Sequence, residues 1–116
     1  MKKYFFLLLA FMPFLSFAQT IDSTWVVNNY IKTEIMVPMR DGTKLFTTIY
    51  APKDNSEKHP ILLERTPYSC APYGENIFKQ YWQSSRMYFL KENYILIIQD
   101  VRGRWMSEGV FEDVIL

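Results

Sequence analysis

The chain has 116 residues, of which 49% are hydrophobic and 17% aromatic, so it is long enough for one domain with a packed core and too apolar for a disordered tail. Its 13 Lys and Arg and 12 Asp and Glu residues give a formal net charge of +1. The basic residues form no block that would attract a phosphate backbone, which argues against nucleic-acid binding.

The first 18 residues have the pattern of a signal peptide. Lys2 and Lys3 form a basic start, residues 4–15 are almost all apolar, and Ala18 provides a small side chain at the cleavage position. The apolar run is shorter than the ~20 residues that a membrane span needs. We therefore predict that residues 1–18 are removed, and that the mature chain, beginning at Gln19, is exported to the periplasm or the extracellular space without a membrane segment.

Cysteine and histidine each occur once, as Cys70 and His59. A single cysteine cannot form an internal disulfide, and Cys70 has no nearby His or Lys that would lower its pKa, so we expect a small packed residue. One His and one distant Cys are too few ligands for a zinc site. The sequence therefore predicts no metal and no cofactor.

An antiparallel hairpin is expected in the first half of the mature chain. Residues 19–30 are polar and predict an irregular segment. From residue 31 to residue 37 the sequence alternates with period two, which indicates a strand whose buried face holds Ile31, Thr33, Ile35 and Val37. Asp41-Gly42 favours a turn with two successive positive φ angles, and residues 44–50 form the second strand.

The second half of the chain alternates strand and helix. Residues 61–64 are a continuously apolar strand that suits the middle of a sheet, and residues 94–99 are another. Between them, residues 76–92 predict a helix that Asn93 ends, because apolar residues recur at helical spacing, namely Ile77, Phe78, Tyr81, Trp82, Tyr88 and Phe89. This order indicates an α/β fold with a right-handed parallel crossover and a sheet covered on both faces.

A loop of glycines, charges and an aromatic residue follows the last strand, at the edge where α/β proteins bind ligands. Asp100 and Arg102 are its first charged residues. They either pin the loop by an ion pair and hydrogen bonds or contact a substrate directly.

Three motifs arrive in a fixed order: residues 38–45 (PMRDGTKL), residues 64–68 (ERTPY), and residues 100–104 (DVRGR) followed by residues 107–109 (SEG). In order and spacing they resemble the start of the cocaine esterase, X-Pro dipeptidyl-peptidase and α-amino acid ester hydrolase family. The resemblance implies that residues 31–116 are the N-terminal portion of an α/β-hydrolase domain, in which an antiparallel hairpin leads into a parallel sheet and the fold is incomplete. Ser69 and Cys70 stand where some members have an acidic or amide residue followed by Lys, so the subfamily stays open.

The resemblance also gives Tyr68 a role. In this fold the loop after the third strand contributes to the oxyanion hole, and Pro67 keeps the chain extended so that the next residue projects from the strand. By resemblance, the Tyr68 hydroxyl donates a hydrogen bond to the oxyanion, while Arg65, Asp100 and Arg102 shape the surrounding loops. The alternative is a tyrosine buried at the helix junction with its hydroxyl bonded to backbone.

The catalytic triad of a serine hydrolase is not in the sequence. No Gly-x-Ser-x-Gly occurs, Ser69 and Ser107 lack the flanking glycines, and His59 precedes the third strand, at the wrong end for a general base. We therefore expect the N-terminal fragment of an exported serine hydrolase of esters or amides, inactive by itself. The alternatives are a self-standing periplasmic binding or interaction module and an inactive gene remnant. Substrate and oligomeric state stay open.

Overall fold

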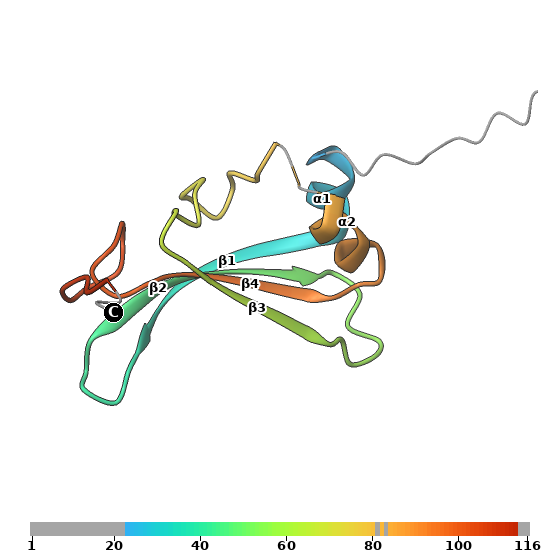
Figure 1. Cartoon of the computed structure of the whole chain (residues 1–116). Coiled ribbons are helices and arrows are strands. Elements are labelled where there is room, and N and C mark those ends of the chain that lie inside the picture. Colours follow the sequence, from blue (N-terminus) through green and yellow to red (C-terminus); the bar gives the residue numbers. More distant parts are fainter. Residues whose placement is uncertain (1–22, 81, 83, 114–116) are drawn as a thin grey trace, which may run out of the picture.

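The computed structural model describes residues 23–80, 82 and 84–113, so the predicted signal peptide and cleavage site lie outside the described residues. Two helices and four strands follow one another along the chain (Figure 1): α1 (Ser23–Asn29), β1 (Tyr30–Pro38), β2 (Lys44–Pro52), β3 (Ile61–Thr66), α2 (Ser84–Lys91) and β4 (Ile95–Asp100). The expectation of an irregular segment over residues 19–30 is wrong from Ser23 onward, where α1 begins. Among these described residues, neither helix has the length and apolarity to cross a membrane.

The predicted hairpin is present. β1 and β2 pair in antiparallel register from Tyr30 opposite Pro52 to Pro38 opposite Lys44. The turn differs from the one expected, because only Gly42 has a positive φ (83°). The Gly42 N–H donates to the Met39 carbonyl at 2.9 Å, and the Met39 N–H to the Thr43 carbonyl at 2.8 Å. A longer turn that ends in one left-handed glycine therefore replaces the two-residue turn.

The four strands form one mixed sheet in the order β1-β2-β4-β3. β4 is antiparallel to β2 and parallel to β3, with Thr66 opposite Asp100 in the last parallel pair. The α/β class and the parallel crossover are thus confirmed. Within the described residues β3 is an edge strand, so its predicted place in the middle of a sheet is not seen here.

The crossover helix is shorter than predicted. α2 begins at Ser84 rather than near Asn76, and it ends as expected before Asn93, which has a φ of 58°. The Asn93 N–H donates to the Leu90 carbonyl at 3.1 Å, as in a left-handed helix cap. At the other end, the Ile77 carbonyl accepts a hydrogen bond from the Lys32 side chain at 2.7 Å, so this part of the chain follows a tertiary contact instead of helix geometry.

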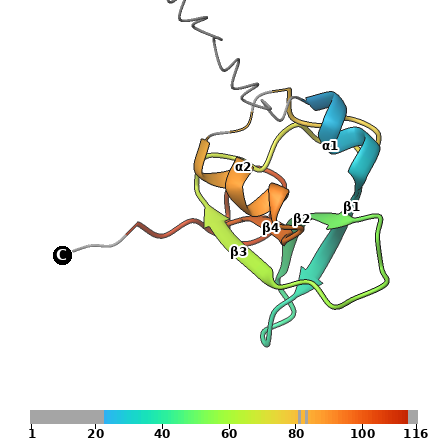
Figure 2. The same ribbon diagram turned by 90° about the vertical axis from the view of Figure 1, so that its right-hand side faces the viewer.

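Both helices cover the same face of the sheet (Figure 2), and the core lies beneath them. The Tyr30 hydroxyl donates to the Leu90 carbonyl at 2.9 Å and lies 3.0 Å from the Tyr94 carbonyl, which ties β1 to the end of α2. Burial raises the pKa of Tyr30 to about 12. The predicted buried face of the first strand is therefore wrong: Tyr30 and Lys32 point into the core, and Ile31 and Ile35 point away from it.

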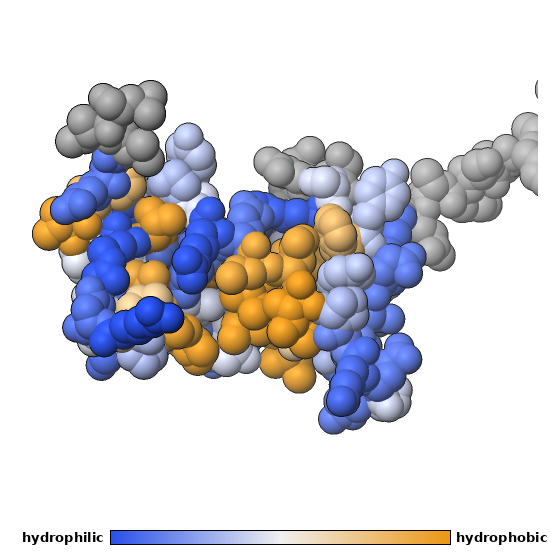
Figure 3. All heavy atoms as spheres, turned by 60° about the horizontal axis from the view of Figure 1, so that its bottom comes forward, coloured by the Kyte–Doolittle hydropathy of each residue, from blue (hydrophilic) through white to orange (hydrophobic). Residues whose placement is uncertain are grey.

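The opposite face of the sheet is apolar and open in the described part of the chain (Figure 3). Ile61, Leu63 and Ile31 are 61%, 51% and 53% exposed. The register places their side chains on one face together with Ile95 and Ile97 of β4. The expectation of a sheet covered on both faces is wrong for these residues, because α1 and α2 share a side.

Candidate active site

Two loops leave the sheet at one edge. β3 and β4 run in parallel and end side by side at Thr66 and Asp100, so the chain segments that follow them are neighbours. The Val101 N–H donates to the Thr66 carbonyl at 3.2 Å and joins the two loops at their base. The carboxyl edge of parallel strands is where this class of fold binds ligands.

Tyr68 lies at this edge with its side chain 83% exposed. Its hydroxyl makes no hydrogen bond with any residue that the structure describes. The surrounding backbone, in contrast, is fixed: the Pro67 carbonyl accepts from the Trp105 indole N–H at 2.9 Å, and the Tyr68 N–H donates to Thr66 Oγ1 at 3.0 Å. The alternative of a buried tyrosine is therefore wrong in this structure, and an anchored backbone presents a hydroxyl that no described residue binds.

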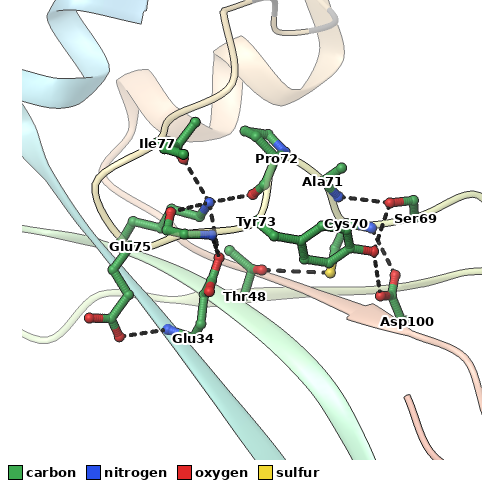
Figure 4. A network of polar contacts seen from close by, with 12 residues as sticks. Glu34, Thr48, Ser69, Cys70, Ala71, Pro72, Tyr73, Glu75, Ile77 and Asp100 are labelled. Carbon is green, nitrogen blue, oxygen red and sulfur yellow. Dashed lines mark hydrogen bonds and ion pairs between the residues drawn. The ribbon is translucent and has the colours of Figure 1, made fainter. Parts of the chain in front are cut away.

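Asp100 holds the residues that follow Tyr68 in the loop after β3 (Figure 4). The residue is completely buried. Its Oδ1 accepts the Cys70 N–H at 2.8 Å, its Oδ2 accepts the Tyr73 hydroxyl at 2.9 Å, and its carbonyl accepts the Ser107 hydroxyl at 2.6 Å. Asp100 therefore binds the loop after β3 through its carboxylate and the loop after β4 through its carbonyl.

Neither serine of these loops has the setting of a nucleophile. Ser69 adopts a φ of 82°, and its Oγ accepts the Ala71 N–H at 3.0 Å and lies 2.9 Å from the Tyr73 hydroxyl. Ser107 Oγ accepts the Phe46 N–H at 2.8 Å in addition to its bond with Asp100. Both hydroxyls hold loop backbone, and neither has a general base as a hydrogen-bond partner in the part of the chain that the structure describes.

Arg102 and Arg65, the other predicted shaping residues, lie apart from this network. Arg102 forms an ion pair with Asp41 at 2.7 Å, and this hydrogen-bonded pair lowers the pKa of Asp41. The pair contributes to the wall of a cavity of about 690 Å³ that Pro67 and Phe111 also line. Arg65 is exposed and lies on the open face with Leu63, so the structure does not bring it to Tyr68.

Cys70 and His59 take no part in a catalytic arrangement among the described residues. Cys70 is fully buried, as predicted, and burial raises the pKa of its thiol to about 11. His59 Nε2 lies 2.6 Å from the Asp54 carbonyl, before the start of β3. Since β3 separates His59 from Tyr68, the histidine is at the opposite end of the sheet, in agreement with the sequence. The described residues contain no group of three side chains that could hold a metal.

Sequence reasoning missed a second anchor of the Tyr68 loop, on β1. Lys32 Nζ is fully buried and donates to the Gly74 carbonyl at 2.9 Å, and Glu34 Oε1 accepts the Gly74 N–H (Figure 4). The available signal was a lysine within a strand whose neighbours on the same face, Tyr30 and Glu34, are equally capable of hydrogen bonding. Tyr73 was missed as well, because nothing local marks it as the partner of Asp100.

Solved structures share this fold. An α-amino acid ester hydrolase superimposes with a TM-score of 0.63 and 34% identity over 87% of this chain and 17% of its own. An aminopeptidase from the marine sediment archaeon Thaumarchaeota archaeon gives a TM-score of 0.63 and 35% identity over 73% of this chain and 14% of its own. A CocE/NonD family hydrolase from Staphylococcus aureus, at 21% identity and a TM-score of 0.52, shares the fold over 72% of this chain and 17% of its own. The mixed sheet and its edge loops are thus the N-terminal part of an α/β-hydrolase of the CocE/NonD type.

The sequence comparisons indicate the same group of hydrolases. The model of the X-Pro dipeptidyl-peptidase (S15) family matches residues 41–114. The cocaine esterase of Rhodococcus sp. (strain MB1 Bresler) is 39% identical over 88 residues, which are 74% of this chain and 14% of that esterase. The chain therefore belongs to the X-Pro dipeptidyl-peptidase (S15) family of hydrolases. It spans about one seventh of the length of the curated relative that it matches.

Proposed function

We propose that this chain is the N-terminal segment of an exported serine hydrolase that cleaves esters or amides, and that the Tyr68 hydroxyl is one donor of its oxyanion hole. Two observations on Tyr68 carry the proposal together: its exposed hydroxyl has no hydrogen-bond partner among the described residues, and its backbone is anchored on both sides. A donor of this kind loses no hydrogen bond within the protein when it binds a substrate oxygen.

The chemistry follows from that placement. A serine outside this chain attacks the substrate carbonyl, whose oxygen becomes negatively charged as the carbonyl carbon becomes tetrahedral. The Tyr68 O–H donates to this oxygen, and the hydrogen bond strengthens as the charge develops, so it lowers the barrier more than it stabilises bound substrate. Collapse of the intermediate expels the alcohol or amine, and water then releases the acyl group.

The names of the relatives support an ester or amide as the substrate class. The cocaine esterase and the α-amino acid ester hydrolase are named for esters, and the aminopeptidase and the X-Pro dipeptidyl-peptidases for peptide bonds. Both classes react through the same charged tetrahedral intermediate, so one oxyanion donor serves either of them. We propose an ester or amide substrate on this ground.

Export rests on the first 18 residues. The basic start and apolar run are typical of a secretory signal, and cleavage after Ala18 leaves Gln19 as the first residue. Mass spectrometry of the protein recovered from the periplasm or the medium tests this directly. A first residue other than one near Gln19, or recovery with the cytoplasm only, contradicts export.

The catalytic proposal is tested by Tyr68→Phe in the enzyme that the chain forms with its in-frame continuation. The ring is kept and one donor is removed, so kcat for a simple aryl ester should fall by about 10²–10³ while KM changes little. Tyr88→Phe, at an exposed tyrosine on α2, is the matched control and should be silent. If Tyr68→Phe leaves kcat within about threefold of the parent, Tyr68 is not an oxyanion donor.

The nucleotide sequence that follows codon 116 separates the enzyme from its alternatives. An in-frame Gly-x-Ser-x-Gly supports the hydrolase, because this motif places the nucleophile on a strand-to-helix turn. A stop codon followed by unrelated sequence supports a self-standing module or a gene remnant. The 116-residue chain by itself should not turn over an aryl ester, since it offers a donor without a nucleophile or base.

A further inference from the structure

The loop that carries Tyr68 is held at two separate places. Asp100 of β4 fixes its first half, through the Cys70 N–H and the Tyr73 hydroxyl. Residues 72–77, here called the return segment, are fixed by β1, the strand at the far edge of the sheet. The second anchor has no part in the chemistry proposed above.

Lys32 is the centre of that second anchor. Its Nζ donates to the carbonyls of three return-segment residues, at 2.9 Å for Gly74, 2.7 Å for Ile77 and 2.5 Å for Pro72. An ammonium group has three N–H donors, so these three carbonyls use all of them. The side chain is fully buried, so removal of its ammonium group leaves the three carbonyls without this donor.

Glu34 completes the anchor. Its Oε1 lies 3.3 Å from Lys32 Nζ and also accepts the Gly74 N–H, while its backbone N–H donates to Glu75 Oε1 at 3.1 Å. The positive charge is therefore balanced within the site. A buried charge that is both paired and hydrogen-bonded in this way fixes geometry, because removing either partner leaves the other unsatisfied.

We propose that Lys32 is a positioning residue for Tyr68, which acts by setting the return segment at a fixed distance from β1. The inference rests on the proposed function of Tyr68. Asp100 holds Cys70, and Lys32 binds the carbonyls on either side of Tyr73, those of Pro72 and Gly74. Only two residues lie between Cys70 and Tyr73. A chain this short spans about 10 Å at full extension, so movement of the return segment is transmitted to Cys70 and to Tyr68.

The first test is amide hydrogen exchange on the dilute 116-residue chain, with Lys32→Met as the variant. Methionine keeps much of the packing volume but has no donor. We expect exchange to become about tenfold faster or more in the return segment and at Cys70, with the β4 amides unchanged. Lys91→Met, at an exposed lysine of α2, is the control and should change neither region.

A second variant keeps the test decisive. In Lys32→Ala, propylammonium chloride should restore protection at Cys70, because it replaces the three methylenes and the ammonium group that the substitution removes, whereas sodium chloride at the same concentration should not. Unchanged exchange at Cys70 in both variants overturns the proposal. Equal acceleration of the β4 amides also overturns it, since Lys32 would then stabilise the whole fold rather than the loop.

The kinetic test uses the enzyme formed with the in-frame continuation. Misplacement of a catalytic group by about 1 Å costs up to about 10²-fold, so Lys32→Met should lower kcat by about 10–10²-fold and leave KM within about twofold. A rise in KM alone contradicts the proposal. The exchange experiment does not depend on hydrolysis, so a faster Cys70 amide together with a silent Tyr68→Phe would reject the oxyanion role and keep the coupling between Lys32 and the loop.

Discussion

Loss of the hydroxyl should lower the stability of the fold at one tyrosine of the loop after β3, Tyr73, and leave it unchanged at the other, Tyr68. The Tyr73 hydroxyl donates to the Asp100 carboxylate at 2.9 Å and lies 2.9 Å from Ser69 Oγ. A hydrogen bond to a charged group contributes about 1.5–3 kcal/mol, so Tyr73→Phe should lower the free energy of unfolding by this amount, roughly 10- to 100-fold in the equilibrium constant. The Tyr68 hydroxyl has no partner in the described structure, so Tyr68→Phe should stay within about 0.5 kcal/mol of the parent.

Urea unfolding of the 116-residue chain at low concentration, followed by tryptophan fluorescence, measures both variants. The midpoint should fall for Tyr73→Phe and remain for Tyr68→Phe, with a similar slope in each case. Equal midpoints for the two variants would refute the assignment of Tyr73 to the Asp100 network. A loss of stability in Tyr68→Phe would refute the conclusion that its hydroxyl is free for a ligand.

The same tyrosine predicts a pH dependence. Burial, with a contribution from the nearby Asp100 carboxylate, raises the pKa of Tyr73 to about 12. In the unfolded chain the Tyr73 hydroxyl ionises near pH 10. The stability that its neutral form contributes is therefore complete below about pH 10 and is lost as the pH rises through about 12. The difference in stability between parent and Tyr73→Phe should therefore shrink over this range. A constant difference would contradict the contact.

Other parts of the molecule give further expectations. Gly103→Ala should disrupt the loop after β4, because its Cβ would lie 2.0 Å from the Phe111 backbone nitrogen. Gly42→Ala has open space around its Cβ and should lower the free energy of unfolding by only about 1–2 kcal/mol, because of its positive φ. Thermal melting compares the two variants. Cys70 should react with iodoacetamide at mildly alkaline pH only after unfolding, and modification of the folded chain at the rate of a free thiol would contradict its burial. We expect the 116-residue chain to associate through its open apolar face, and replacing Ile61 by Lys and Leu63 by Glu should reduce this association in sedimentation velocity. Association that the two replacements leave unchanged would show that the open face is not the contact surface.

The sequence was a good guide where local patterns decide the structure. The Asp-Gly pair marked the hairpin, Asn93 marked the end of α2, and the short apolar runs marked β3 and β4. It also marked Tyr68 through Pro67, although the role of Tyr68 stays a proposal. For the hairpin turn and the end of α2, the deciding interaction lies within a few residues of the signal.

The sequence failed where a distant partner decides. Period-two alternation in β1 predicts two faces but not which of them is covered. Ile31 and Ile35 are therefore predicted to be buried, whereas the structure buries Lys32, whose three acceptors come from the loop after β3. The same lysine binds the Ile77 carbonyl, in a part of the chain where the sequence predicts helix and the structure has none. Nothing in the local sequence marks Tyr73, whose hydroxyl is bound to Asp100, 27 residues further along the chain.

The loop after β4 is bound to the start of β2 through Glu108. The Glu108 N–H donates to the Lys44 carbonyl and the Lys44 N–H to Glu108 Oε2, each at 2.9 Å. The hairpin turn at residues 39–43 therefore moves with this loop, and an insertion there would be transmitted to the Tyr68 edge. Residues 53–60, at the other end of the sheet, are mostly exposed and are the better place for an affinity tag or a fused domain.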